Sequence, residues 1–349
     1  MNKSYLFCLI LIIFALVSCS IESNKTLKID TRYLLLSGEL SSNSILLQCR
    51  FASTDTLINN DIPGKKGIAR FELAKDSLFL DKIEGHWQES TQDSDFIIKN
   101  KFKGLESSTV YFYRAKAMLS DDIDTTYSRI GNFKTLPSNK VEEEVSFAMS
   151  TGFNYESFYG IGKDKNEIPK TTQKIPASGI DSIMGFEAFE AVQELKVNFF
   201  IANGDIVYYD KPNNVKNLWA RNIGQMRAKW HRYFAMPRNK NLILKTPVYY
   251  LKDDHDYRFN DCDTTNVKFS NPSHNLGVQV FREQVPVTDP ADPLAKTYRS
   301  HRMGKHLELW FLEGRDYRSP NEMEDNNEKT LWGKEQLEWL KKSMLASNA

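Results

Sequence analysis

The sequence predicts a mixed fold, with an all-β sandwich in the first part of the chain and an α/β domain in the second. Between residues 28 and 137, short β-branched and aromatic runs are separated by turn-forming residues, a spacing typical of a β-sandwich. Between residues 145 and 349, buried-strand patterns are separated by stretches with helical periodicity, which favours β-α-β units. A polar, charged run at 138–144 predicts the domain boundary.

Composition excludes some classes of protein. The chain has 349 residues, with 46 Lys and Arg against 45 Asp and Glu, so its formal net charge is +1. This balance is no signature of nucleic-acid binding and argues against an anionic membrane surface as the main partner. Aromatic residues make up 12% of the chain, which is typical of a globular protein and not of a disordered one.

The first 19 residues predict an export signal. Lys3 gives a positive start, and the apolar core 6–17 is shorter than a comfortable membrane span. The segment Leu16-Val-Ser-Cys19 resembles a bacterial lipobox, in which the cysteine is lipidated and becomes the mature N-terminus. We therefore expect a lipid anchor at Cys19 and a location in the bacterial cell envelope, on the periplasmic or outer-membrane side. The alternative is an ordinary secretory signal with a chance cysteine.

The sandwich is predicted strand by strand. Cys49 lies in an apolar strand pattern and is expected to be a buried small hydrophobic residue. Segments 105–114 and 131–137 resemble the corner and the final strand of fibronectin type III-like domains, which implies that the Tyr111 hydroxyl bonds back to the backbone. The predicted strands are 33–37, 44–51, 68–73, 95–99, 110–116 and 131–135.

The α/β domain is predicted in the same way from periodicity. Asn, Pro, Asp and Thr are frequent at 262–296, and we expect a long loop there. Two short strands, 298–301 and 306–312, are expected to pair through a turn at Gly304. The predicted helices are 179–196, 215–235 and 330–346.

Carboxylates follow two of the predicted strands. The strand 197–202 leads into Asn203-Gly204-Asp205, and the strand 246–251 leads into the polar run 252–261, which contains Asp253-Asp254-His255-Asp256. Ligands of open α/β sheets bind beyond the carboxyl ends of the strands, and clustered carboxylates repel one another unless a cation neutralises them. Two such strand ends can hold one metal centre between them. The alternative is a solvated acidic turn.

These motifs carry a family resemblance. Gly204-Asp205-Ile-Val-Tyr208 and Asp253-Asp254-His255-Asp256-Tyr257 resemble two motifs of the calcineurin-like metallophosphoesterases, and of their PhoD-like alkaline phosphatase branch in particular. The segments 312–318 and 333–340 resemble later parts of the same branch. The resemblance implies a four-layer α/β fold, a preceding fibronectin III-like domain and hydrolysis of a small-molecule phosphate ester, as an alkaline phosphatase or phosphodiesterase.

The resemblance also implies residue roles. Two metal ions, chosen among calcium, iron, manganese and zinc, would be bridged by Asp205 and bound by Asp254, with Tyr208 completing a metal shell. Metal-bound hydroxide would attack phosphorus while His255 donates to the phosphate or the leaving oxygen. Asp256, Asn260 and Asp261 would act as supporting groups that fix His255 and its loop.

Two segments complete the expected site. Thr151 stands where the PhoD-like branch often has a cysteine ligand, and Asn154 or Glu156 could substitute through oxygen, with Asn154 taken as the candidate metal ligand. Arg315 and Arg318 have guanidinium groups suited to phosphate, and ion pairs with nearby carboxylates are the alternative. Cys262, just past the acidic run, is expected to be a plain loop cysteine.

Family members of this type continue past the point that corresponds to Ala349, with further strands and an Asp-x-His pair. The resemblance therefore implies that this chain is the N-terminal part of a metallophosphoesterase domain, which would be incomplete. Two function hypotheses follow. The first is a lipid-anchored phosphoesterase. The alternative is a catalytically inactive surface lipoprotein, in which a β-sandwich binding module precedes a degenerate phosphatase remnant.

Overall fold

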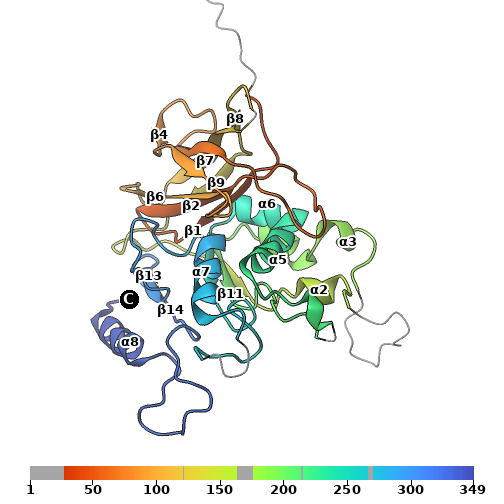
Figure 1. Cartoon of the computed structure of the whole chain (residues 1–349). Coiled ribbons are helices and arrows are strands. Elements are labelled where there is room, and N and C mark those ends of the chain that lie inside the picture. The colour runs from red at the N-terminus through yellow and green to blue at the C-terminus, as the bar shows by residue number, and fades with distance from the viewer. Residues whose placement is uncertain (1–26, 121, 163–175, 214, 266–269) are drawn as a thin grey trace, which may run out of the picture.

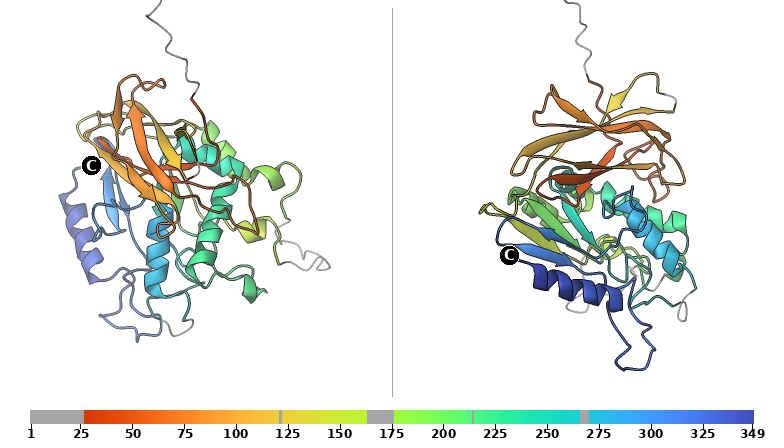
Figure 2. Two further views of the ribbon diagram at one scale, coloured as in Figure 1. Left: turned by 45° about the horizontal axis from the view of Figure 1, so that its top comes forward. Right: turned by 90° about the vertical axis from the view of Figure 1, so that its left-hand side faces the viewer.

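The computed structural model describes residues 27–120, 122–162, 176–213, 215–265 and 270–349 (Figure 1). The expected signal peptide and the expected lipidation site Cys19 lie outside the described residues. A β-sandwich lies at one end of the molecule and an α/β layer at the other, as both views in Figure 2 show. Within the described ranges, no helix has the length and the apolar character needed to cross a membrane.

Two sheets form the sandwich, and every strand predicted in this part of the chain is present. Three further short strands were not predicted, because two or three residues are too few to show a periodicity. The first sheet contains β1 (Leu34–Gly38), β2 (Ser44–Arg50) and β6 (Ile97–Lys103). The second contains β3 (Gly67–Ala74), β4 (Lys82–Glu84), β5 (Gln88–Ser90), β7 (Val110–Leu119), β8 (Thr126–Tyr127) and β9 (Gly131–Lys134).

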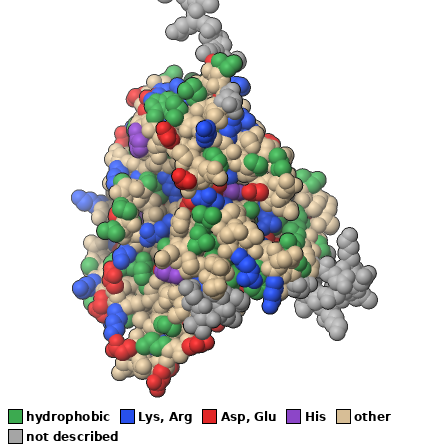
Figure 3. Space-filling model, viewed as in Figure 1, with side chains coloured by type: hydrophobic (Ala, Val, Ile, Leu, Met, Phe, Trp, Pro, Cys, Tyr) green, Lys and Arg blue, Asp and Glu red, His purple; other side chains and the backbone are tan. Residues whose placement is uncertain are grey.

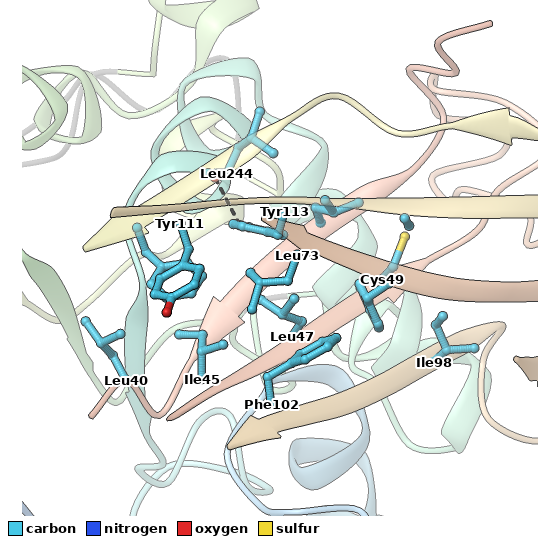
Figure 4. Close-up of a cluster of buried hydrophobic side chains, with 14 of the residues drawn as sticks. Leu40, Ile45, Leu47, Cys49, Leu73, Ile98, Phe102, Tyr111, Tyr113 and Leu244 are labelled. Atoms are coloured by element: carbon cyan, nitrogen blue, oxygen red, sulfur yellow. Dashed lines mark hydrogen bonds between the residues drawn. The ribbon is translucent and has the colours of Figure 1, made fainter. Parts of the chain in front are cut away.

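A buried apolar cluster fills the space between the two sheets (Figure 4). Cys49 is fully buried in it, which confirms the prediction for this residue. The Tyr111 hydroxyl accepts a hydrogen bond from the backbone N–H of Glu106 at 3.0 Å, as predicted for this tyrosine. The Tyr113 hydroxyl donates to the carbonyl of Leu244 at 3.0 Å, so the cluster reaches into the second half of the chain.

The first sheet of the sandwich continues into the α/β part. The strands β10 (Phe147–Ser150), β11 (Phe199–Asn203) and β12 (Val248–Leu251) are parallel, and β12 also pairs in parallel with β1 at Gly38 and Val248. A Cβ atom at Gly38 would lie 2.8 Å from the Val248 carbonyl oxygen, so only glycine permits this junction. The run 138–144 therefore links two parts that share one six-stranded sheet.

The helices differ from prediction in several places. The expected helix 215–235 is an α-helix only from Ile223 onward, after a short 3-10 helix at Lys216–Leu218. The expected helix 179–196 is two helices, α3 (Asp181–Met184) and α4 (Glu187–Glu194), because Gly185 adopts φ 88° between them. The expected loop 262–296 contains α7 (His274–Gln284). Ser273 caps this helix by accepting a hydrogen bond from Leu276 N–H, a start signal that the surrounding Asn and Pro residues concealed.

The other elements lie close to their predicted positions. The turn at Gly304 joins the predicted antiparallel pair, and the last predicted helix is present. Pro237 begins a helix that was not predicted separately. The remaining elements are α2 (Tyr155–Phe158), η1 (Lys216–Leu218), α5 (Ile223–Ala235), α6 (Pro237–Lys245), β13 (Arg299–Arg302), β14 (Glu308–Phe311) and α8 (Lys334–Ala346).

A histidine from α5 joins the two parts of the molecule. His231 is buried, and its Nδ1 and Nε2 atoms lie 2.5 Å from Asp61 and 2.6 Å from Asp95, both in the sandwich. Arg50 and Gln284 also bond to the Asp95 carboxylate. Burial alone would raise the pKa of Asp95, but the contacts with His231 and Arg50 hold it below its ordinary value.

We predict that Asp95→Asn destabilises the protein by roughly 3 kcal/mol, because Arg50 and His231 stay buried beside a group that no longer carries charge. Asp61→Asn is the matched control, since the Asp61 side chain is 44% exposed and its loss costs about 1 kcal/mol or less. Urea denaturation at neutral pH measures both changes. Equal, small losses in the two variants would contradict a structural role for the buried bridge.

Candidate metal centre

The two acidic loops meet because β11 and β12 are neighbouring parallel strands. Asn203 lies opposite Leu251 at their carboxyl ends, so the residues that follow leave the sheet side by side. Gly204 has φ 79°, and a Cβ atom on it would lie 2.6 Å from the Cβ of Asp253. Asp205 continues the turn at φ 53°. Glycine at this position is what allows the two loops to touch.

Asp205, Asp254 and His255 come together as the sequence predicted. One potential ligand atom from each of the three side chains lies within 4.8 Å of the others. Asp205 Oδ1 is buried and has no hydrogen-bond partner among the described residues. A buried carboxylate oxygen without a partner is costly, and a cation would satisfy it. The two carboxylates, with an imidazole beside them, fit a divalent metal ion.

Tyr208 lies against this group. Its hydroxyl donates to Asp205 Oδ2 at 3.1 Å, and its ring lies 4.3 Å from the His255 ring, measured between centroids. Burial raises the pKa of the Tyr208 hydroxyl, and the Asp205 carboxylate raises it further. Burial also raises the pKa of Asp205, with Asp254 and Asp253 adding to the effect. The site therefore concentrates negative charge where little water screens it.

His255 is oriented by a residue that was not predicted. Its Nδ1 atom lies 2.7 Å from Asp210 Oδ1, so Nε2 is the ring nitrogen left for the site. Burial acts to lower the pKa of His255, but the hydrogen bond to Asp210 and the nearby carboxylates raise it above its ordinary value. Asp210 lies in the irregular segment after β11, where no periodicity marked it.

Asp256 connects the two loops. Its carboxylate accepts hydrogen bonds from Ile206 N–H at 3.1 Å and from Asp253 N–H at 2.7 Å. The side chain is fully buried, and this burial raises its pKa well above the ordinary value. These contacts fit the supporting role predicted for Asp256.

Asn260 and Asp261 contact the site through their backbones. The Asn260 N–H donates to Asp210 Oδ2 at 2.9 Å, and the Asp261 N–H donates to Asp254 Oδ2. The Asp261 side chain is exposed and lies near Arg315. Supporting roles for these two side chains remain predictions, while the backbone contacts explain why the loop folds back over Asp254.

Arg315 lies beside the acidic cluster. Its guanidinium group lies 2.7 Å from Asp253 Oδ1 and 3.7 Å from Asp254 Oδ1. The ion pair with Asp253 is of the kind that the sequence offered as the alternative to phosphate binding, while the adjacent Asp316 pairs with the buried ammonium of Lys252. Arg318 is half-buried, and its charge helps to lower the pKa of Asp263 against the effect of burial. Cys262 contacts the Asp254 carbonyl, and burial raises the pKa of its thiol to about 11.

The segment after β10 completes the edge of the site. Thr151 donates to the Gly204 carbonyl at 2.8 Å, and Phe153 N–H donates to the Asp205 carbonyl at 2.9 Å. The Asn154 side-chain oxygen caps α2 by accepting from Ser157 N–H at 2.9 Å, and its role as a metal ligand stays a prediction. Glu156, the other candidate, forms a buried ion pair with Lys229 at 2.5 Å.

The fold and the site together define a protein with carboxylates and an imidazole gathered at the ends of parallel strands, behind a β-sandwich. Comparison with known proteins identifies the family. The PhoD-like phosphatase family matches residues 173–349, and its N-terminal domain matches residues 20–137. The chain belongs to the PhoD-like phosphatase family.

Comparisons with individual proteins also find phosphatases. Alkaline phosphatase D of Bacillus subtilis (strain 168) is 22% identical over an alignment 342 residues long, which covers 90% of this chain and 53% of that protein. A solved structure of PhoD matches 92% of this chain and 62% of its own, at 21% identity and a TM-score of 0.67. A purple acid phosphatase from yellow lupin seeds shares the fold at a TM-score of 0.51 and 13% identity, over 92% of this chain and 49% of its own. The chain thus spans about half the length of the curated relative.

We predict that Gly204→Ala destabilises the protein by roughly 1–3 kcal/mol and weakens divalent metal binding, because the added methyl group clashes with Asp253 and strains a positive φ. Gly314→Ala is the control, since a Cβ atom there meets no atom within 4 Å. Thermal denaturation with and without Mn²⁺ reports both effects. An unchanged melting temperature in Gly204→Ala would show that close contact between the loops is not required.

A second prediction concerns metal binding itself. Asp205→Asn and Asp254→Asn should each weaken Mn²⁺ binding at least about tenfold, because each removes a charged ligand. Asp124→Asn, at an exposed loop position, should bind as the unaltered protein does. Isothermal titration calorimetry measures the three affinities. Similar affinities in all three variants would show that the metal binds at another position.

Proposed function

We propose that this protein is a metal-dependent phosphoric ester hydrolase of the bacterial envelope, acting as an alkaline phosphatase or phosphodiesterase on small-molecule phosphate esters. The observation that carries the proposal is the group formed by Asp205, Asp254 and His255, with a guanidinium group beside it. Membership of the PhoD-like phosphatase family supports the same reaction class and does not favour the alternative of an inactive surface lipoprotein.

The residues present fit a metal cofactor. Asp205 and Asp254 would hold it, with Tyr208 and Asn154 as further candidate ligands, and the predicted complement is two ions. A bound cation would neutralise phosphate charge and lower the pKa of a water molecule. The oxygen-rich donor set favours hard cations such as calcium or manganese over soft ones, although zinc and iron also accept imidazole and carboxylate ligands.

The protein's own side chains supply the rest of the chemistry. Burial acts to lower the pKa of His255, but the hydrogen bond of Nδ1 to Asp210 and the nearby carboxylates raise it, which favours a proton on Nε2. That proton can be donated to a phosphate oxygen or to the leaving oxygen. Arg315 presents a second cationic donor, which is held in place by a hydrogen bond from its Nε to Asp253. Arg318 lies further along the same loop and is proposed as a weaker contact to substrate.

The remaining parts of the proposal rest on sequence resemblance. Residues 1–19 would be a lipoprotein signal peptide, and Cys19 would carry the lipid. The described sandwich at 28–137 would be fibronectin III-like, and residues 145–349 would be the N-terminal part of a four-layer phosphatase domain. The buried contact between His231 and the Asp95 carboxylate, together with the pairing of β1 and β12, supports a rigid unit in which the sandwich stabilises the strands that carry the site.

We predict that His255→Ala lowers kcat for p-nitrophenyl phosphate or its bis ester by about a hundredfold to ten-thousandfold, because the proton donor is lost. Asp210→Asn should lower kcat by about tenfold to a hundredfold, since the imidazole loses its orienting partner. His306→Ala is the control, because that histidine is exposed in the turn between β13 and β14. The proposal would be contradicted if the unaltered chain showed no metal-stimulated hydrolysis, or if His255→Ala kept full activity.

A further inference from the structure

The start of the described chain and the β3–β4 loop both lie against β8 (Figure 1). Ile29 forms a β-bridge with Tyr127, the last residue of β8. The Arg114 guanidinium carbon lies 4.0 Å from the Phe79 ring centroid and 4.3 Å from the Tyr127 ring centroid. Arg114 therefore fixes the β3–β4 loop beside β8.

The β3–β4 loop has a defined structure that exposes two leucines. The Asp76 side chain accepts hydrogen bonds from Leu78 N–H at 2.9 Å and from Leu80 N–H at 3.2 Å. Phe79 between them is buried under Arg114 and has φ 58°, an unfavourable value for a residue with a side chain. Leu78 and Leu80 are left 74% and 81% exposed. Such strain persists where the surrounding structure imposes it, often for function.

Four exposed apolar side chains result, and we call them the sandwich tip: Leu27, Ile29, Leu78 and Leu80. Figure 3 shows hydrophobic side chains at this upper end of the molecule. Acidic residues such as Asp76 and Asp81 alternate with basic ones such as Lys75 and Lys82 in the same loop, so the surroundings carry no strong net charge. A partner attracted by apolar contact fits this surface better than a polyanion does.

The chain length before the tip identifies that partner. Cys19, the proposed lipidation site, precedes Leu27 by eight residues. Eight fully extended residues span at most about 28 Å, so a lipid on Cys19 holds Leu27 within that distance of the bilayer. This step rests on the proposed function, in which the protein is a lipoprotein of the bacterial envelope.

We propose that the sandwich tip rests on the lipid bilayer, with Leu78 and Leu80 inserted among the headgroups. The lipid then tethers the chain, and the apolar loop sets its orientation. A single acyl chain gives weak attachment, and a second contact makes attachment stable.

This orientation points the candidate metal centre away from the membrane. Figure 2 shows the sandwich, where the described chain begins, at one end of the molecule and the α/β layer that carries the site at the other. Water-soluble phosphate esters, and not the headgroups of the same bilayer, are therefore the substrates that reach the centre.

Spin labels test this orientation in the lipidated full chain, reconstituted into phosphatidylethanolamine and phosphatidylglycerol vesicles. Labels are attached to Leu78→Cys, to Leu80→Cys and to the control Leu345→Cys, an 88% exposed leucine of α8. Protein without an added cysteine gives the background from Cys262. Collision rates with oxygen and with a water-soluble nickel complex report the depth of each label, and hydrolysis by the same samples is measured separately.

We expect nickel collisions to fall several-fold and oxygen collisions to rise at positions 78 and 80, with position 345 unchanged, at any phosphatidylglycerol fraction. Nickel access at 78 and 80 equal to that at 345 overturns the proposal, and so does an intact mass that shows no lipid on Cys19. Loss of hydrolysis with labels still at depth would count against the proposed reaction and leave the orientation supported. Insertion that requires phosphatidylglycerol would overturn the apolar basis of the contact.

Discussion

The buried carboxylate of Asp256 holds the candidate metal centre together. It accepts backbone hydrogen bonds from both acidic loops, and so it fixes the distance between Asp205 and Asp254 before any cation binds. Burial raises the pKa of Asp205, and repulsion from the neighbouring Asp254 carboxylate raises it further. The protein thus builds electrostatic strain that a cation relieves, which is what a preorganised metal site requires.

The β-sandwich supports this arrangement from behind. One sheet runs from β10 through β12 into β1, β2 and β6, and the buried cluster of the sandwich includes side chains of β11 and β12. His231 adds a polar link between α5 and the sandwich loops. The strands that present the site are therefore clamped along their length, and only their carboxyl ends are free to form loops. The first domain acts as a structural part of the site's scaffold.

Much of this was predictable from the sequence. Gly204-Asp205 and the run at 253–256 each follow a buried-strand pattern, and parallel strands must bring such ends together. Asp210 was not predictable, because it lies in irregular chain and acquires its role only when His255 folds against it. The continuity of the sheet was hidden for a similar reason, since the pairing of Gly38 with Val248 joins residues far apart in sequence. Local patterns predict which residues leave a strand together, while contacts between distant segments depend on the whole fold.

Anomalous diffraction from crystals soaked in Mn²⁺ tests the central claim most directly. The account predicts a manganese peak in contact with the Asp205 oxygen that lacks a hydrogen-bond partner among the described residues, and also in contact with Asp254. Such a peak would place the cation between the two strand ends. Crystals that bind manganese only at other positions, or that show Asp205 and Asp254 moved apart without a cation, would contradict it.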